Sequence, residues 1–300
     1  MINITLPDGS VKEFEAGATA MDVAKSISEG LARSVISASF NGTKVETTTP
    51  LHEDGSLILF TFRDEEGKKA FWHSTSHVMA DALQQLYPGI KLTIGPAIDN
   101  GFYYDIDFGD QKISENDFKK IEDKMLEIAR GKHEFQLRSV TKAEALEFYK
   151  NENNPFKVEL IENLTDGDIT FCDHSNFTDL CRGGHLPNTG FVKAVKLMSV
   201  AGAYWRGDEN KPQLTRVYGI SFPKQKDLTE YLELLEEAKK RNHRLIGKQL
   251  DLFSLHEEGP GFIFFHPKGV VIINTLIDFM RNELNKLNYK EIMTPMELSK

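Results

Sequence analysis

The chain has 300 residues, of which 40% are hydrophobic and 27% are charged, and its formal net charge is −9. This is the composition of a globular protein with enough chain for two or three domains. No apolar run approaches the roughly 20 residues that a membrane-spanning helix needs, and the first residues lack the basic and apolar segments of a signal peptide.

The charges and the cysteines limit the partners and the compartment. The negative total argues against indiscriminate nucleic-acid binding but leaves room for a specific RNA partner. Residues 181–224 carry seven Lys or Arg against two acidic residues, and residues 239–248 carry five with none. Such runs indicate either an RNA contact or simply a solvated face. Cys172 and Cys181 are too few for a disulfide framework and predict a reducing, cytoplasmic location.

The first 62 residues predict a small domain of strands and one helix. Pro7-Asp8-Gly9 is a turn signal between two alternating segments, so we expect a hairpin there. Thr19 is suited to cap a helix that runs to about residue 27. Short strands are expected at 2–6, 11–14, 35–41, 43–45 and 56–62. This pattern is typical of a β-grasp, ubiquitin-like domain, for which we expect binding or docking rather than catalysis.

A second domain is expected over residues 63–224, opened by a polar linker at 63–69. Its first helix carries His73 and His77, which lie four residues apart and therefore on one face. Apolar residues occupy the opposite face: Val78, Met79, Ala82, Leu83 and Leu86. The other expected elements are a hairpin within 92–107, helices at 114–130 and 141–150 with capping boxes that start at Ser114 and Thr141, a short strand that begins near Lys157, and strands at 168–172, 193–200 and 213–221. This mixture predicts an α+β fold.

One long helix over residues 227–250 is predicted to bridge to a third domain. That domain is expected to start at Asp251-Leu-Phe. The last segment is too short to build a core of its own. We therefore expect the sequence to be a fragment of a chain that continues past Lys300.

Two pairs of residues form the candidate site. His73 and His77 make one pair, and Cys181 and His185 make the other, within a loop that contains Gly183-Gly184. Three imidazoles and one thiol form a suitable set for tetrahedral Zn²⁺. Without metal, the same groups can position a water molecule and transfer protons near neutral pH. The residues alone leave both possibilities open.

Other polar and aromatic residues surround these pairs. Asp179 and Arg182 flank Cys181, whereas Lys157 taken alone resembles an ordinary surface lysine. Most nearby aromatic residues are expected in the core, although some could stack on bases: Phe71, Trp72, Tyr103, Tyr104, Tyr204 and Trp205. The sequence contains no Walker-type phosphate loop, dinucleotide fingerprint or nucleophile elbow.

Five motifs, in this order, resemble those of the bacterial threonyl-tRNA synthetases. They are His73-Ser-Thr-Ser-His77, Gly95-Pro-Ala-Ile-Asp-Asn-Gly-Phe-Tyr-Tyr-Asp105, Asp179-Leu-Cys-Arg-Gly-Gly-His185, Ala201-Gly-Ala-Tyr-Trp-Arg-Gly-Asp208 and Arg241-Asn-His-Arg-Leu-Ile-Gly-Lys-Gln-Leu-Asp-Leu-Phe253. The resemblance covers essentially the whole chain. It implies a β-grasp TGS domain at 1–62, an α+β editing domain at 63–224 of the kind shared with alanyl-tRNA synthetases, a linker helix at 225–242, and the start of a class II antiparallel-sheet catalytic domain at 243–300. Thr294-Pro295 resembles the end of class II motif 1, a dimer-interface element.

The resemblance also implies an activity and partners for the full-length enzyme. That enzyme attaches threonine to tRNA(Thr) through a threonyl-adenylate, uses ATP, Mg²⁺ and one Zn²⁺, and forms a homodimer through its class II domain. The ATP-binding motifs and the zinc ligands of the synthetic site lie beyond residue 300. The present chain is therefore expected to edit but not to aminoacylate, and no membrane partner is expected.

An editing site is needed because serine differs from threonine by a single missing methyl group, which gives only about 1–3 kcal/mol of discrimination. By resemblance, the editing residues are His73, His77, Lys157, Asp179, Cys181 and His185. We expect water-mediated ester hydrolysis in which either His73 or Lys157 orients or activates the water. Asp179 is expected to hold the aminoacyl ammonium or the terminal ribose, and the other three residues to shape the pocket against the methyl group of threonine. The four His and Cys residues could hold a metal, but the resemblance favours a metal-free pocket.

Three alternatives compete with this interpretation. One is a stand-alone deacylase that edits mischarged tRNA in trans, against which the class II-like segment at 251–300 argues. Another is a non-catalytic RNA-binding or regulatory module built on the β-grasp domain, which would leave the clustered His and Cys residues without a role. The third is a metallohydrolase with another substrate, against which the basic stretch at 181–248 argues.

Overall fold

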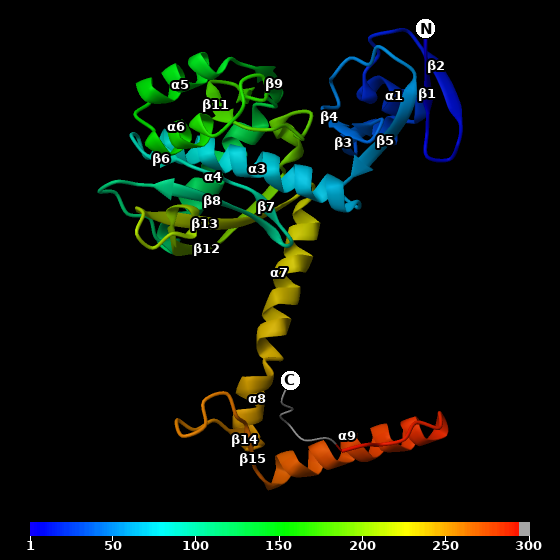
Figure 1. Ribbon diagram of the computed structural model, residues 1–300, viewed down its shortest axis with the longest axis vertical. Helices are drawn as coiled ribbons and strands as arrows, with labels where there is room; N and C mark the ends of the chain where they lie inside the picture. Colours follow the sequence, from blue (N-terminus) through cyan, green and yellow to red (C-terminus); the bar gives the residue numbers. More distant parts are fainter. Residues whose placement is uncertain (294–300) are drawn as a thin grey trace. The chain divides into compact units, whose positions relative to one another are not determined.

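The computed structural model describes residues 1–293, which divide into two compact units, Met1–Thr229 and a second unit that begins at Glu230. The first unit contains three β-sheets and the helices that cover them (Figure 1). Thr294 and Pro295, on which the expectation of a class II motif 1 rests, lie outside the described residues. No helix within residues 1–293 is long and apolar enough to cross a bilayer.

The N-terminal part forms a five-stranded mixed sheet with the strand order β2-β1-β5-β3-β4. β1 and β5 pair in parallel, and the other neighbouring strands are antiparallel. The elements are β1 (Ile2–Thr5), β2 (Val11–Phe14), α1 (Ala20–Ile27), α2 (Glu29–Ala32), β3 (Val35–Phe40), β4 (Thr43–Val45) and β5 (Gly55–Thr61). Thr19 caps α1 as predicted, because its side chain accepts from the Asp22 N–H while the Asp22 carboxylate accepts from the Thr19 N–H. The predicted β-grasp fold is confirmed.

Helix α3 (Glu65–Leu86) corrects the predicted linker at residues 63–69. The Asp64 carboxylate accepts from the Thr61 N–H at 2.7 Å and ends β5 in a tight turn, and acidic residues in the first turn of the helix suit its positive end. Gly67 permits this turn, because a Cβ at that position would lie only 1.9 Å from the Thr61 carbonyl oxygen. The helix is also buried more completely than one apolar face predicts, since Phe71, Ser74 and Thr75 are enclosed as well.

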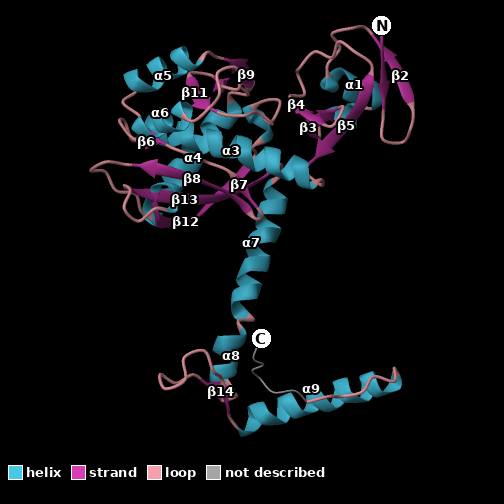
Figure 2. Cartoon of the chain, viewed as in Figure 1, coloured by secondary structure: helices cyan, strands magenta, loops and turns pink. Residues whose placement is uncertain are grey.

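A second sheet has the strand order β12-β13-β8-β6, with β7 paired to β8, and all its pairs are antiparallel. Its strands are β6 (Lys91–Leu92), β7 (Ala97–Ile98), β8 (Gly101–Asp107), β12 (Ala194–Tyr204) and β13 (Gln213–Phe222). α3 packs against β8 and β13, and α4 (Phe118–Arg130) packs against α3 and β12 (Figure 2). The predicted capping box at Ser114 forms on a short 3₁₀ turn at Glu115–Asp117 that leads into α4. Two further 3₁₀ turns occur at Thr189–Phe191 and Trp205–Gly207.

A third, smaller antiparallel sheet carries part of the site. It comprises β9 (Gln136–Ser139), β10 (Thr170–His174) and β11 (Phe177–Leu180), and it is accompanied by α5 (Lys142–Asn151) and α6 (Pro155–Glu162). A core shared by these elements includes Ala145, Tyr149, Ile161 and Phe171. Thr141 caps α5 as expected, but the Glu144 carboxylate bonds the Arg138 guanidinium at 3.1 Å instead of closing the predicted box. A charged partner competes successfully with a backbone N–H for this carboxylate.

The predicted single helix over 227–250 is in fact two helices, α7 (Gln225–Lys240) and α8 (His243–Gln249). The break falls at Asn242, whose side chain accepts from the Arg244 N–H at 3.0 Å and therefore caps a new helix. The rest of the second unit comprises a short hairpin of β14 (Phe253–Ser254) and β15 (Phe264–Phe265), followed by α9 (Pro267–Lys286). Much of the apolar surface of this unit is exposed, including Phe262 and Phe279.

Candidate active site

A cavity of about 620 Å³ lies within the first unit and falls in the size range of ligand pockets. α3, α6, the segment before β7 and the loop after β11 form most of its walls, and Ser37, Ala38, Lys44 and Phe60 of the N-terminal sheet region complete it. Five predicted site residues line it: His73, His77, Lys157, Asp179 and Cys181. His185 lies beside the cavity, in contact with Cys181. The fold therefore brings together all six predicted residues.

α3 supplies the two histidines of the first pair. The Nε2 atom of His73 lies 3.0 Å from the Cys181 Sγ atom, and the ring centroids of His73 and His77 are 4.7 Å apart. His77 is only 2% exposed, whereas His73 is half-buried. One helical turn therefore places both imidazoles on the same wall of the cavity.

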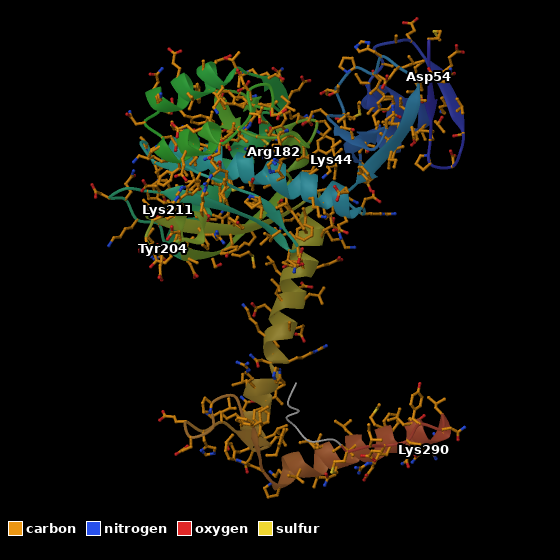
Figure 3. The ribbon with its side chains drawn as sticks, in the orientation of Figure 1. Lys44, Asp54, Arg182, Tyr204, Lys211 and Lys290 are labelled. Carbon is orange, nitrogen blue, oxygen red and sulfur yellow. The ribbon has the colours of Figure 1, made fainter. Side chains whose placement is uncertain are left out.

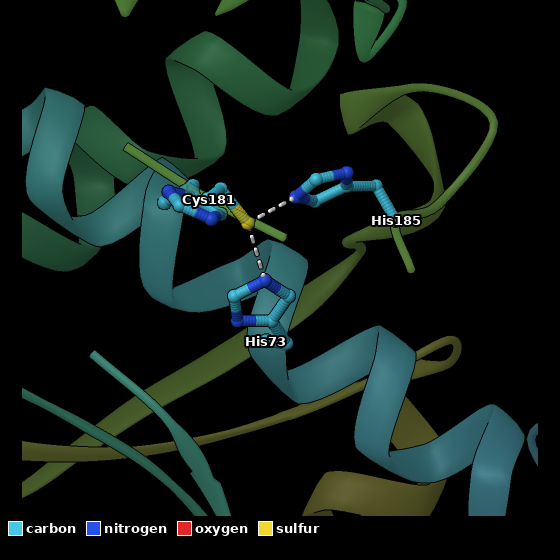
Figure 4. Close-up of side chains that lie close together, drawn as sticks. His73, Cys181 and His185 are labelled. Atoms are coloured by element: carbon cyan, nitrogen blue, oxygen red, sulfur yellow. Dashed lines mark hydrogen bonds between the residues drawn. The ribbon is translucent and has the colours of Figure 1, made fainter. Parts of the chain in front are cut away.

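The loop after β11 supplies the second pair. Cys181 follows the last residue of β11, and its Sγ atom lies 3.1 Å from the Nε2 atom of His185. The sulfur is therefore held between the rings of His73 and His185 (Figure 4). The Leu186 N–H donates to the Ser74 Oγ atom at 2.8 Å and ties this loop to α3.

Cys181 and His185 shift each other's pKa toward the charged form. Burial alone would raise the pKa of the Cys181 thiol, but the electrostatic influence of the neighbouring His73 and His77 rings and the hydrogen bond from His185 outweigh it and hold the pKa well below its ordinary value. Burial alone would lower the pKa of His185, but its contacts with Cys172, Cys181 and Glu46 raise it well above the ordinary value. The arrangement therefore favours a thiolate that accepts hydrogen bonds from both flanking rings.

A second charged group lines the same cavity, next to His77. The Nζ atom of Lys157 is 2.5 Å from the Asp179 Oδ1 atom, and the two side chains are only 2% and 3% exposed. The Tyr104 hydroxyl donates to the Asp179 Oδ2 atom at 2.6 Å, and the His77 Nδ1 atom lies 3.2 Å from the same oxygen. Burial alone would raise the pKa of Asp179, but the charges of Lys157 and His77 hold it far below its usual range. Asp179 is therefore an anion whose oxygens are already occupied by protein groups.

Lys157 lies in the first turn of α6, which corrects the expected strand. Pro155 is compatible with the first helical turn because its missing N–H would be unpaired there anyway. Asn154 caps the helix, since its side chain accepts from the Lys157 N–H at 3.2 Å and donates to the Leu92 carbonyl at 2.7 Å. The cap fixes the start of the helix and directs Lys157 toward Asp179.

Three residues that form hydrogen bonds within the site were not predicted as site residues from the sequence. Tyr104 was expected in the core or stacked on a base, although it lies within one of the motifs. Tyr149 accepts from the Leu180 N–H at 2.7 Å, and Glu46 contacts the 184–185 backbone from the N-terminal sheet region. Burial raises the pKa of both tyrosines well above the ordinary value, so they remain neutral donors. No sequence signal pointed to Tyr149 or Glu46, because their roles depend on contacts between distant elements.

The remaining aromatic residues divide as expected between core and surface. Phe71, Trp72 and Trp205 are buried, whereas Tyr204 is 45% exposed and Tyr103 is half-buried against Arg216. The predicted mostly internal location is therefore confirmed.

The basic stretches are partly neutralised within the chain. Arg216 forms two hydrogen bonds with Asp105, Lys211 pairs with Glu159, and Lys240 pairs with Glu237. Lys44 and Arg182, labelled in Figure 3, line the cavity itself, where Lys44 pairs with Glu66 at 2.5 Å. Arg182 therefore adds a positive charge at the cavity.

The distances between the ligand atoms of the four His and Cys residues can be compared with those in a tetrahedral Zn²⁺ site. Their ligand atoms all lie within 4.8 Å of one another, and the donor set is one that Zn²⁺ accepts. The sulfur is nevertheless only 3.0 and 3.1 Å from the two nearest ring nitrogens, whereas tetrahedral Zn²⁺ would separate such atoms by roughly 3.5 Å. A small outward movement would suffice to accommodate the ion. His73, His77, Cys181 and His185 would then hold it, and bound zinc would act as a Lewis acid.

Two family models match the chain and define its class. Residues 2–61 match the TGS domain, and residues 169–218 match the Threonyl and Alanyl tRNA synthetase second additional domain. The first range contains the five-stranded N-terminal sheet, and the second contains Asp179, Cys181 and His185. The chain thus combines a TGS domain with the editing domain of threonyl- and alanyl-type synthetases.

Comparison with individual proteins shows which of these two types of synthetase the chain resembles. Over 296 residues, which make up 98% of this chain and 45% of each relative, it is 68% identical to the threonine--tRNA ligase of Flavobacterium johnsoniae and 66% identical to that of Flavobacterium psychrophilum. It is 53% identical over 297 residues to the threonine--tRNA ligase of Caldanaerobacter subterraneus subsp. tengcongensis, covering 99% of this chain and 46% of that protein. The chain is therefore homologous to the N-terminal portion of threonine--tRNA ligases and spans less than half of their length.

Proposed function

We propose that this chain is part of a threonyl-tRNA synthetase and that its cavity hydrolyses seryl-tRNA(Thr). The observation that carries the proposal is the convergence of His73, Cys181, Lys157 and Asp179 on one cavity within the editing-type domain. The relatives are named threonine--tRNA ligases, and we propose for the whole protein the ATP-dependent attachment of threonine to tRNA(Thr) through threonyl-adenylate. That step would take place in the part of the relatives that this chain does not span, together with ATP, Mg²⁺, the synthetic-site Zn²⁺ and the homodimer contact.

The domain organisation forms part of the same proposal. We place the TGS domain at 1–62, the editing domain at 63–224, the linker helix at 225–242 and the start of the class II catalytic domain at 243–300. The hairpin β14–β15 and the exposed apolar surface of α9 are consistent with a segment that packs against further chain. The cytoplasm, where tRNA is charged, is the proposed location.

His73 is the better candidate of the two groups that could activate water. A Cys181 thiolate can only accept hydrogen bonds, so the contact at 3.0 Å requires a proton on the His73 Nε2 atom. The proposed role of His73 uses the neutral ring, in which the Nδ1 atom is then the acceptor. Lys157 instead donates to the Asp179 carboxylate, and an ammonium has no lone pair with which to take a proton from water.

The proposed reaction is hydrolysis of the seryl ester. His73 Nδ1 takes a proton from water as the water oxygen bonds the ester carbonyl carbon. The Lys157 ammonium is available to stabilise the oxyanion that forms, and the bond to the ribose oxygen then breaks, with that oxygen taking up a proton. The products are serine and tRNA.

The other residues position groups or select the substrate. Asp179 fixes Lys157, Tyr104 and His77, and because its oxygens are occupied it acts as an anchor rather than as a direct ligand of the aminoacyl ammonium. This revises the role expected from the sequence. His77 and Cys181 form the wall that excludes the additional methyl group of threonine, and His185 supports this wall through its contact with Cys181.

Single-turnover deacylation of seryl-tRNA(Thr) by the chain tests these assignments. We expect His73→Ala and Lys157→Ala each to lower the rate by about 10²–10⁴-fold, the typical contribution of acid–base or charge-stabilising groups. His52→Ala and Lys150→Ala change the same residue types at exposed positions and should leave the rate unchanged. Wild-type rates in both site variants, measured on proteins whose folding is confirmed by melting curves, would overturn the proposal.

A further inference from the structure

Glu46 connects the N-terminal sheet region to the candidate site. It follows β4, far in sequence from the loop after β11, yet it belongs to the same compact unit. Its Oε1 atom accepts from the Gly184 N–H at 2.8 Å and lies 3.0 Å from the His185 Nδ1 atom. Its Oε2 atom accepts from the His185 N–H at 3.0 Å. One carboxylate therefore binds two successive backbone N–H groups and an imidazole.

The Gly183-Gly184 pair explains why the loop can receive this carboxylate. Both glycines have positive φ, +91° and +88°, which side-chain-bearing residues rarely adopt. Successive N–H groups in such a turn converge and form a concave anion-binding site. The anion here is the chain's own Glu46, whose side chain is only 10% exposed. A carboxylate buried to this extent is stable only when its oxygens are hydrogen-bonded.

The contact reaches the centre of the site through His185. Glu46 contacts the Nδ1 edge of the ring, and the Nε2 edge lies 3.1 Å from the Cys181 Sγ atom. The same sulfur lies 3.0 Å from His73 Nε2. Glu46, His185, Cys181 and His73 therefore form a continuous chain of polar contacts, in which Glu46 fixes the orientation of the ring that holds the sulfur.

We propose that Glu46 is a positioning residue of the editing site and that the TGS domain, through this carboxylate, completes the site rather than serving only as a docking module. The inference rests on the proposed function, because the consequence concerns seryl-tRNA hydrolysis. Glu46 touches no reacting atom. Its role is to keep His185 and the 183–185 loop in the geometry that Cys181 and His73 require.

Glu46→Gln tests the proposal with little change in volume. A glutamine has one acceptor oxygen and a donating NH₂ group, so it cannot satisfy three donors and must turn its NH₂ toward one of them. We expect kcat for seryl-tRNA(Thr) hydrolysis to fall by about 10–100-fold while KM stays nearly constant, because misplacement affects the reacting geometry more than tRNA binding. Glu13→Gln removes the same charge from an exposed position on β2 and should match the wild type. An unchanged kcat in Glu46→Gln, or a change confined to KM, would overturn the proposal.

Chemical rescue separates positioning from general loss of structure. Glu46→Ala leaves the Gly183-Gly184 concavity intact but empty, so added formate should restore part of the lost kcat, whereas equal concentrations of chloride should not. Formate should have no such effect on Glu13→Ala. Failure of formate to raise kcat in a Glu46→Ala protein with a near-wild-type melting temperature would contradict the assignment.

Hydrogen exchange provides a readout that does not depend on activity. The Gly184 and His185 amides should exchange slowly in the wild type and much faster in Glu46→Ala, because their acceptor is lost. If the wild type does not hydrolyse seryl-tRNA but the exchange difference is present, the proposed function fails and the contact between the domains stands. If activity is present and the exchange rates are equal, the function stands and the role of Glu46 is wrong.

Discussion

Lys157 and Asp179 form a buried ion pair, with the Nζ atom 2.5 Å from the Oδ1 atom on the wall of the cavity. Neither sequence spacing nor hydropathy connects these residues, which lie 22 positions apart on a helix and a strand. A buried pair of opposite charges contributes a fixed electric field to the site. It also makes each partner dependent on the other.

This dependence predicts non-additive effects on stability. Lys157→Met or Asp179→Asn alone leaves one buried charge unpaired and should lower the free energy of unfolding by about 3–5 kcal/mol. The double variant Lys157→Met/Asp179→Asn leaves no charge behind and should lose clearly less than the sum of the two single changes. Urea denaturation of the four proteins checks this. Strictly additive losses would contradict the pairing.

His174 gives a prediction about pH. Burial lowers the pKa of this residue from its ordinary value of 6.5, and the nearby Asp81 carboxylate only partly opposes the shift. The unfolded chain therefore binds the proton more readily than the folded protein does. The contribution of His174 to stability is fully present above about pH 6.5 and is lost as the pH falls from that value toward the lower folded pKa.

His174→Gln should accordingly show a smaller loss of unfolding free energy than the wild type when the pH is lowered from 7.5 to 5.5. His52→Gln, which removes an exposed histidine, should retain the wild-type dependence. The measurement is urea denaturation at both pH values. An equal loss of unfolding free energy between pH 7.5 and 5.5 in wild type and His174→Gln would show that protonation of the buried ring does not determine stability in this pH range.

Alanine in place of a helical glycine usually stabilises a protein. At the junction between β5 and α3 we expect the opposite effect on stability. Gly30→Ala in α2 places its Cβ 3.9 Å from the neighbouring Ser28 Oγ atom and should stabilise the chain by about 0.5–1 kcal/mol. Gly67→Ala places its Cβ 1.9 Å from the Thr61 carbonyl oxygen and should instead destabilise it by about 1–3 kcal/mol. Thermal unfolding of both variants tests the contact. Stabilisation by Gly67→Ala would mean that α3 does not start against β5.

Metal removal tests the nature of the His and Cys cluster. The short contacts between the Cys181 sulfur and the His73 and His185 rings favour direct hydrogen bonding over shared coordination. We expect purified protein to contain substoichiometric zinc by elemental analysis, and seryl-tRNA hydrolysis to survive dialysis against a chelator. Stoichiometric zinc together with loss of activity on chelation, restored by added zinc, would assign these residues as ligands instead.

Much of the fold follows from local sequence signals. Thr19, Ser114 and Thr141 cap helices as predicted, and alternation located the strands of the N-terminal sheet to within about one residue at either end. Such features depend on neighbours a few residues away. The errors arose where two local signals competed. Polar residues at 63–69 suggest a linker but also suit the first turn of a helix, and a continuous helical pattern concealed the break that Asn242 creates by capping α8.

The site was predictable only in part. Spacing found His73, His77, Cys181 and His185, because chemically distinctive residues stand in close pairs. Lys157 and Asp179 entered only through resemblance to a family, and spacing alone would not have found them. Tyr149 and Glu46 could not be predicted at all, since a common residue gains its role from a distant element that the fold brings next to it.

The most direct test of the central claim compares the hydrolysis of two substrates by the wild-type chain. Seryl-tRNA(Thr) and threonyl-tRNA(Thr) should be incubated separately with excess protein, and their first-order deacylation rates compared with spontaneous hydrolysis. We expect the chain to accelerate loss of the seryl ester strongly and to spare the threonyl ester, with a ratio well above the roughly 10–200-fold that one methyl group provides in a single binding step. Equal rates for the two esters, or a seryl rate no faster than the spontaneous one, would contradict it.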